Sequence, residues 1–144
     1  MQSLIRDINL ATEGRKKIDW VSNFMPTLNT LGDRFEAEQT FKGQTIVVSV
    51  HLEAKTAYLA TVLKRGGADV IVTGSNPLST QDDVAAGLVD MGITVYAWYD
   101  CTDEEYFNFL HKALDHKPHI IIDDGGDLVN LLHTTRQDAK ERLL

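Results

Sequence analysis

Short runs of β-branched and other apolar residues alternate with longer amphipathic segments through most of the chain. Four such runs are rich in Val, Ile and Thr and are bounded by Gly, Pro, Asn or Asp, which is the pattern of buried parallel strands. Segments of helical length fit between them, so the pattern predicts an α/β fold with a parallel sheet and helices on both faces, a three-layer arrangement like that of flavodoxin or Rossmann domains. The four expected strands are residues 45–50, 70–73, 94–97 and 120–122.

Glycines and hydroxyl side chains mark the ends of two helices between these strands. The helix over residues 56–65 stops at Gly66, which can take the backbone conformation that closes a helix. A second helix follows Ser79 and Thr80, whose hydroxyls are candidates for its N-terminal cap, and it ends at Gly92.

A third helix is expected to begin at a capping box. Thr102 and Glu105 have the spacing at which each side chain accepts from the other residue's backbone N–H. Tyr106, Phe109 and Leu110 then recur at helical spacing, which predicts that they face the core.

A helical extension precedes the α/β part of the chain. Pro26 separates two amphipathic segments over residues 7–22 and 26–37. We therefore expect one domain in which residues 1–44 form an N-terminal helical segment and residues 45–144 form the α/β core.

Composition and charge exclude several classes of protein. The hydrophobic fraction of 43% and the charged fraction of 24% are ordinary for a globular domain. A net charge of −7 argues against a nucleic-acid partner, and no apolar run reaches the roughly 20 residues that a membrane span needs. Cys101 is the single cysteine, so an internal disulfide is impossible and a cytoplasmic location is expected.

Polar side chains follow each predicted strand. In open α/β sheets, ligands bind beyond the carboxyl ends of the strands, at the point where the connections diverge. This edge of the sheet is therefore where a functional site is expected. The segments that reach it are residues 51–55, 74–76, 98–100 and 123–127.

The first of these segments contains His51, Glu53 and Lys55 at alternate positions. A helix that begins near Glu53 would direct its N-terminal N–H groups at a ligand, and His51 is a candidate acid or base at neutral pH. The alternatives are a structural histidine at the end of a strand, and an exposed charged pair formed by Glu53 and Lys55.

The last segment is the run Asp123-Asp124-Gly125-Gly126-Asp127. Its glycines allow the backbone to approach a ligand closely. The alternative is a tight turn in which one aspartate caps the following helix, and Asp127 is the expected cap.

Two other features of the sequence are weaker evidence for a functional site. The run of residues 76–80, Asn-Pro-Leu-Ser-Thr, can be explained by turn and cap chemistry alone. Neither the Gly66-Gly67 pair nor the glycine pair of residues 125–126 belongs to a Gly-x-Gly-x-x-Gly fingerprint, so we expect no dinucleotide site in this chain. We expect no metal site either.

Taken together, these motifs resemble the adenosylhomocysteinase (S-adenosylhomocysteine hydrolase) family. The most specific signal is the sequence NPLSTQDD at residues 76–83 followed by DDGGDL at residues 123–128, and the similarity covers nearly the whole chain. Members of the family continue well beyond this length. The resemblance thus implies that residues 1–144 are the N-terminal part of the substrate-binding domain, that the NAD-binding domain lies outside this chain, and that the chain alone is inactive.

The resemblance also implies an activity. Enzymes of this family reversibly hydrolyse S-adenosylhomocysteine to adenosine and homocysteine, using tightly bound NAD to oxidise the ribose so that homocysteine can be eliminated. By motif match, His51 and Asp124 would be the acid and base near the 5′ carbon, and the substrate would be bound by His51, Glu53, Lys55, Thr56 and Asp124. The family further implies a homo-oligomer, expected to be a tetramer.

One departure from the family pattern concerns the nucleobase. Most members have His-x-Thr-x-Glu or His-x-Thr-x-Gln where this chain has His51, Glu53 and Lys55, a substitution typical of a sub-group found largely in thermophiles. A lysine has three donors and no acceptor, which suits a 6-oxo purine. S-inosylhomocysteine therefore joins S-adenosylhomocysteine as a candidate substrate.

The residues alone also allow two interpretations in which the protein is not a catalyst. A free-standing flavodoxin-like domain with paired aspartates at a strand end could be a receiver-type or Mg²⁺-binding module, although His51 stands where a receiver domain has acidic residues. A regulatory relative that binds partners without catalysing a reaction is the other alternative.

Overall fold

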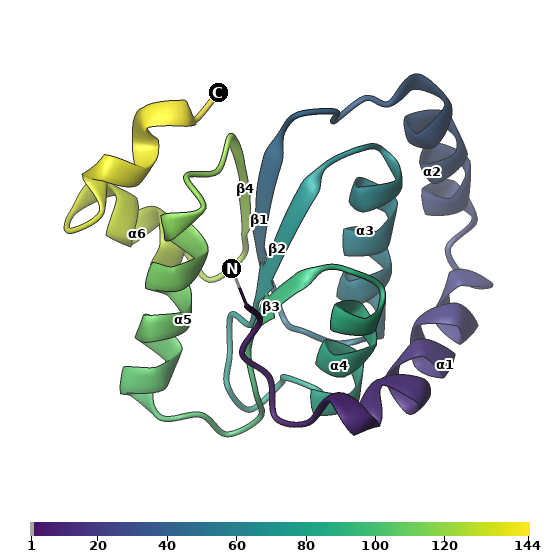
Figure 1. Cartoon of the computed structure of the whole chain (residues 1–144), viewed down its shortest axis with the longest axis horizontal. Coiled ribbons are helices and arrows are strands. Elements are labelled where there is room, and N and C mark those ends of the chain that lie inside the picture. Colours follow the sequence, from purple (N-terminus) through teal and green to yellow (C-terminus); the bar gives the residue numbers. More distant parts are fainter. Residues whose placement is uncertain (1) are drawn as a thin grey trace.

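The computed structural model describes residues 2–144 and shows a central parallel sheet between two layers of helices (Figure 1). Within these residues the strands lie in the order β3-β2-β1-β4, and every pairing is parallel. The predicted strands are confirmed, each to within one residue at either end. Their bounds are Thr45–Ser49 for β1, Asp69–Thr73 for β2, Thr94–Tyr96 for β3 and Ile120–Asp123 for β4.

Helices cover both faces of the sheet, as expected, because strand side chains alternate between two buried clusters. Val48 and Val72 point into the cluster beneath α3 and α4, whereas Val47 and Ile71 point into the cluster beneath α5 and α6. The helices are α3 (Ala54–Arg65), α4 (Asp82–Asp90), α5 (Asp103–Asp115) and α6 (Asp127–His133), with a final 3₁₀ helix, η2 (Gln137–Arg142).

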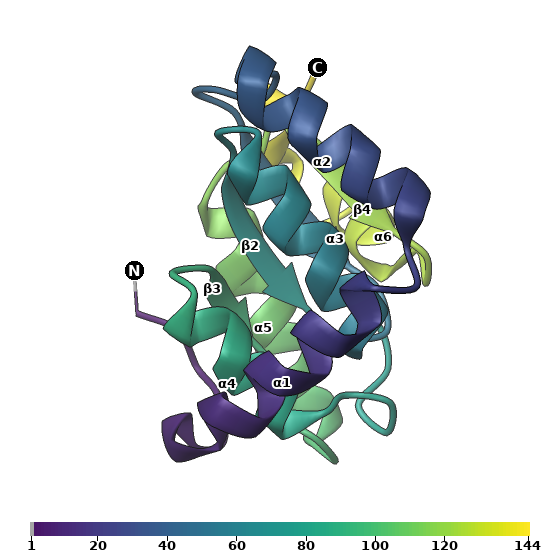
Figure 2. The same cartoon turned by 90° about the vertical axis from the view of Figure 1, so that its right-hand side faces the viewer.

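The predicted N-terminal helices are also present, and they pack on the α/β core. After the short helix η1 (Ile8–Leu10), α1 (Ala11–Ser22) crosses α4, and α2 (Pro26–Glu38) lies along α3 (Figure 2). The crossing is close: a Cβ atom at Gly14 would lie 1.7 Å from the carbonyl oxygen of Asp83. The helical segment thus belongs to the packed body of the structure.

The caps of the helices agree with the sequence at one place and differ at another. The capping box of Thr102 and Glu105 is formed at the start of α5, with both reciprocal hydrogen bonds. The predicted hydroxyl cap of α4 is wrong, because that helix begins at Asp82 and its N-cap residue, Gln81, makes no side-chain cap. The hydroxyl of Ser79 is instead engaged in the site described below.

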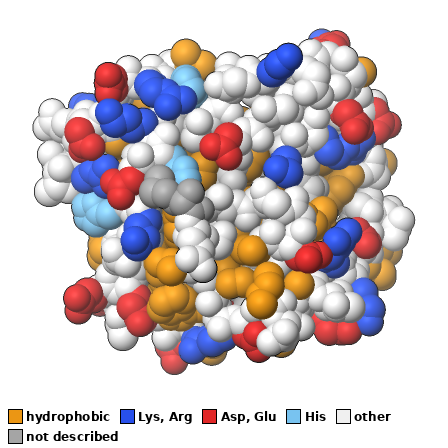
Figure 3. Space-filling view, viewed as in Figure 1, with side chains coloured by type: hydrophobic (Ala, Val, Ile, Leu, Met, Phe, Trp, Pro, Cys, Tyr) orange, Lys and Arg blue, Asp and Glu red, His pale blue; other side chains and the backbone are white. Residues whose placement is uncertain are grey.

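Basic and acidic side chains lie next to one another across the face shown in Figure 3. Several basic side chains are held in ion pairs, for example Lys17 with Asp83 at 2.6 Å and Arg65 with Glu36 at 2.6 Å. Among residues 2–144, no helix combines the length and the apolar character that crossing a membrane would require.

Candidate functional site

The strand order creates a divergence point at the centre of the sheet. The chain leaves β1 through α3 on one face and pairs β2 on one side of β1, whereas β4 arrives from α5 on the other face and pairs on the opposite side. The carboxyl ends of β1 and β4 therefore flank a crevice of the kind in which open α/β sheets bind ligands.

His51 and Asp124 meet across this crevice. The ladder between β1 and β4 continues past the strands, because the backbone N–H of Asp124 donates to the carbonyl oxygen of Ser49 at 3.3 Å. This register brings Nε2 of His51 to 3.9 Å from Oδ2 of Asp124. Both side chains are accessible, with exposed fractions of 53% for His51 and 41% for Asp124, so a ligand can reach them.

The other ring nitrogen of His51 contacts a residue that sequence reasoning had not assigned to the site. Nδ1 of His51 lies 2.7 Å from the hydroxyl oxygen of Ser79, which belongs to the loop after β2. The sequence alone explains Ser79 only as part of a turn or cap. The signal that could have found it is topological: β1 and β2 are parallel neighbours, so the segments that follow them reach the same place.

The first turn of α3 carries the other predicted binding residues. Glu53 is the N-cap of this helix, and its Oε1 accepts from the backbone N–H of Thr56 at 3.1 Å, so the helix begins where the sequence predicted. Thr56 is buried and Lys55 is exposed. No ion pair joins Glu53 to Lys55 among the residues described, which leaves the ammonium group of Lys55 available to a ligand.

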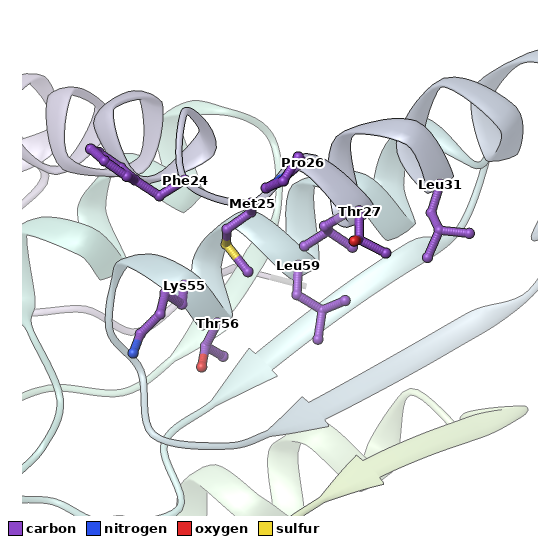
Figure 4. A pocket seen from close by; sticks show the side chains of 9 residues that line it. Phe24, Met25, Pro26, Thr27, Leu31, Lys55, Thr56 and Leu59 are labelled. Carbon is purple, nitrogen blue, oxygen red and sulfur yellow. The ribbon is translucent and has the colours of Figure 1, made fainter.

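An apolar groove opens beside Lys55 and Thr56. Its volume is about 570 Å³, and Figure 4 shows Met25 reaching from the α1–α2 junction toward the first turn of α3. A groove of this size and apolar character suits a planar ring such as a nucleobase. The remaining lining residues are Phe24, Pro26, Thr27, Leu28, Leu31 and Leu59.

The turn after β4 is held by Asp123. Its Oδ1 accepts from the backbone N–H groups of Gly125 at 3.1 Å and Gly126 at 3.0 Å, and its Oδ2 accepts from Val129 at 3.1 Å. Gly126 has a φ of +84°, a conformation that favours glycine, and this lets the chain curl back over the Asp123 carboxylate. Both carboxylate oxygens of Asp123 therefore accept hydrogen bonds within the turn, whereas the carboxylate of Asp124 remains available to a ligand.

Asp127 does not cap α6, so that prediction is wrong. Its Oδ2 accepts a hydrogen bond of 2.8 Å from the hydroxyl of Tyr106, whose oxygen also lies 3.3 Å from the carbonyl oxygen of Ser75. Tyr106 is buried, as predicted, and burial together with the hydrogen bond to Asp127 raises the pKa of its phenol. The phenol thus stays protonated, holds the turn after β4 through Asp127 and lies against the loop after β2.

The turn between β1 and α3 differs from a dinucleotide-binding turn. Dinucleotide-binding sheets place glycines and a free helix N-terminus against the pyrophosphate at this turn. Here the turn contains His51, Leu52 and Glu53, and the Glu53 carboxylate already occupies the helix N-terminus. A carboxylate at that position would repel a pyrophosphate. This turn therefore does not fit the pyrophosphate of NAD.

Two further chemistries find no support in the part of the chain described. No group of three or more His, Cys, Asp or Glu side chains within residues 2–144 is arranged to hold a metal ion. Cys101 is buried, and burial raises the pKa of its thiol, which disfavours the reactive thiolate.

Comparison with known proteins gives a consistent result. The model of the S-adenosyl-L-homocysteine hydrolase family matches residues 2–144. A protein of Methanocaldococcus jannaschii named S-inosyl-L-homocysteine hydrolase is 54% identical over 97% of this chain and 34% of its own length. A protein of Pyrococcus abyssi named adenosylhomocysteinase is 52% identical over 96% of this chain and 33% of its own length. The chain thus spans about a third of the length of these curated relatives.

Proposed function

This chain belongs to the S-adenosyl-L-homocysteine hydrolase family, and we propose that it is the N-terminal part of the substrate-binding domain of such an enzyme. In this proposal residues 1–44 are the helical segment of that part, residues 45–144 are its α/β core, and NAD is bound by residues outside this chain. The observation that carries the proposal is the approach of His51 to Asp124, 3.9 Å apart at the divergence point of the sheet.

The pair of His51 and Asp124 suits the proton transfers of thioether hydrolysis. When the bond between the 5′ carbon and sulfur breaks, the departing sulfur takes a proton, and when water adds at the 5′ carbon, a proton leaves the water. An imidazole can do both in turn, giving its proton to sulfur as the imidazolium and then taking one from water. The Asp124 carboxylate would stabilise the charged ring between these steps.

Glu53, Lys55 and Thr56 are proposed to bind the nucleobase at the mouth of the apolar groove. Lys55 is exposed and can donate to a 6-oxo group, as in inosine. Glu53 uses Oε1 to cap α3. Its second oxygen can accept from a 6-amino group, as in adenosine. The pair can therefore serve either base.

The substrate class in this proposal is S-adenosylhomocysteine and S-inosylhomocysteine. Close relatives carry both names, since the Methanocaldococcus jannaschii protein is named for the inosyl thioether and the Pyrococcus abyssi protein for the adenosyl one. We further propose a homo-oligomer, expected to be a tetramer by analogy with the family, and a cytoplasmic location, which the single buried cysteine supports.

A hybrid enzyme tests the proposal. This chain would replace the segment that it matches in the Methanocaldococcus jannaschii relative, and release of homocysteine from both thioethers would be measured. We expect the hybrid to turn over at least one of them and the 144-residue chain alone to turn over neither. A hybrid that folds and binds NAD like the parent relative but releases no homocysteine would contradict the proposal, as would turnover by the chain alone.

A further inference from the structure

The hydroxyl of Ser79 makes two contacts that together fix where its proton lies. Its oxygen is 2.7 Å from Nδ1 of His51 and 3.0 Å from the carbonyl oxygen of Asn76. A carbonyl oxygen can only accept, and a hydroxyl has one proton to donate. Both contacts are hydrogen bonds at once only if Ser79 donates to Asn76 and accepts from an N–H at Nδ1 of His51.

The loop that carries Ser79 is itself held on both sides. The side chain of Asn76 accepts from the backbone N–H of Leu78 at 2.8 Å, and the N–H of Ser79 donates to the Asn76 carbonyl at 3.1 Å. The N–H of Gln81 donates to the carbonyl oxygen of Leu52 at 2.9 Å, which attaches the loop to the residue after His51. Ser79 is thus placed by contacts that do not depend on the imidazole.

We propose that Ser79 is a positioning residue that holds neutral His51 in the tautomer protonated at Nδ1. The lone pair then lies on Nε2, the nitrogen that faces Asp124 at 3.9 Å. Nε2 is in consequence the atom that gives a proton to the departing sulfur and then takes one from the incoming water. The tautomer itself is independent of the proposed function, and only its consequence for proton transfer rests on that function.

The arrangement follows a general rule for histidine bases: the hydrogen bond made by one ring nitrogen sets which nitrogen is free to react. A free imidazole favours protonation at Nε2, so the Nδ1 form is a specific expectation. Without the serine, the basic lone pair of the neutral ring would lie mainly on Nδ1, turned away from Asp124.

Nitrogen NMR of the imidazole rings in the 144-residue chain tests the tautomer directly. Long-range ¹H–¹⁵N spectra would be recorded at alkaline pH, where the rings are neutral, and the His51 signals among the five histidines would be assigned by their loss in a His51→Asn variant. We expect the wild-type chain to show a protonated Nδ1 and an unprotonated Nε2. A protonated Nε2 in the wild-type chain overturns the proposal, and this measurement needs no change at Ser79.

Variants at Ser79 sharpen the test. Ser79→Ala should lower the ratio of the Nδ1–H to the Nε2–H form by about 2- to 10-fold, the factor expected for one net hydrogen bond, whereas Ser79→Thr keeps the hydroxyl and should keep the ratio. Ser22→Ala is a matched control, because the Ser22 hydroxyl also donates to a backbone carbonyl, that of Asp19, but does not contact His51. An unchanged ratio in folded Ser79→Ala would contradict the proposal.

Kinetics of the hybrid enzyme separate this inference from the proposed function. Ser79→Ala in the hybrid should lower kcat for homocysteine release and leave KM nearly unchanged, since the serine orients the base without binding the substrate. If His51→Asn leaves the hybrid fully active while NMR finds the Nδ1 tautomer, the proposed function fails and the positioning by Ser79 stands. If His51→Asn abolishes turnover while NMR finds the Nε2 tautomer, the positioning fails and the proposed function stands.

Discussion

The loops after β1 and after β4 both hold one acidic cap and one polar residue that is free of side-chain hydrogen bonds within its own loop, but in opposite order along the chain. After β1 the free residue, His51, comes first, and the cap, Glu53, follows at the start of α3. After β4 the cap, Asp123, comes first as the last residue of the strand, and the free residue, Asp124, follows.

Glycine explains the difference between the two loops. The positive φ of Gly126 lets the second loop curl back, so that backbone N–H groups further along the chain reach a carboxylate that precedes them. The first loop has no glycine, and its cap must stand at the helix start itself. Which acidic residue is free for chemistry is therefore decided by the path of the backbone, and neighbouring aspartates can have different roles.

The largest expected effect concerns Asp124, the free residue of the second loop. Asp124→Asn in the hybrid enzyme should slow homocysteine release by roughly 10²–10⁴-fold, the usual scale for a lost acid or base group. The stability of the 144-residue chain should change by less than about 0.5 kcal/mol, because the side chain is exposed and caps nothing. Steady-state kinetics and urea unfolding measure the two quantities. A stability loss comparable to that of an Asp123 variant would remove the distinction between the two aspartates.

The second effect concerns Glu53 and Lys55 in the first loop. The double change Glu53→Thr, Lys55→Glu should shift the ratio of kcat/KM for the adenosyl over the inosyl thioether by about 10- to 100-fold toward adenosyl, since a charge-assisted hydrogen bond contributes roughly 1.5–3 kcal/mol. Threonine can also cap a helix, so α3 should stay intact. Lys42→Glu, an exposed substitution at the opposite edge of the sheet, is the control. An unchanged ratio would show that neither side chain reads the 6-position.

Replacing Asp123, the cap of the second loop, should affect stability, whereas replacing Asp124 should affect activity. Asp123→Ala leaves the N–H groups of Gly125, Gly126 and Val129 without their acceptor, and it should lower the free energy of unfolding by about 1–2 kcal/mol. Urea unfolding of the 144-residue chain beside an Asp124→Ala variant gives the comparison. Equal losses in the two variants would contradict the assignment of the cap to Asp123.

The smallest expected effect is that of Tyr106, which anchors the second loop through Asp127. Tyr106→Phe removes the hydrogen bond of 2.8 Å and should lower the free energy of unfolding by about 0.5–1.5 kcal/mol at neutral pH. Because the pKa of Tyr106 is raised in the folded chain, the folded state keeps the proton longer than the unfolded state does. The contribution of the phenol is thus complete below the unfolded pKa of about 10 and declines as the pH rises above it. If the free energy of unfolding of the wild type exceeded that of Tyr106→Phe by a growing amount above that pH, Tyr106 would not anchor the loop in this way.

The strands and helices were predictable because their signals are local. Each strand is a β-branched run bounded by turn residues, and the capping box of Thr102 and Glu105 lies within four consecutive residues. The same logic placed His51 and Asp124 at one edge of the sheet, since carboxyl ends of parallel strands share an edge. Their distance of 3.9 Å required the strand order, which places β4 next to β1.

The errors of sequence reasoning all involve long-range partners. Asp127 has the position of a cap in the sequence, but its carboxylate accepts a hydrogen bond from Tyr106, which lies 21 residues earlier in the chain. Ser79 has the position of a cap for α4, but the loop it belongs to turns toward His51, 28 residues earlier. Residues with short polar side chains fit several local roles, and only the packing of distant segments selects among them.

In the proposed function, His51 acts on protons at the 5′ position and not on the ribose. The most direct test uses His51→Asn in the hybrid enzyme with a substrate labelled with deuterium at the 4′ carbon. Loss of the label to solvent reports activation of the ribose, which the proposal assigns to residues outside this chain, whereas homocysteine release reports cleavage at the 5′ carbon. We expect release to fall by roughly 10²–10⁴-fold while loss of the label changes by less than about tenfold. Loss of both to the same extent, or loss of label exchange with release retained, would contradict the proposal.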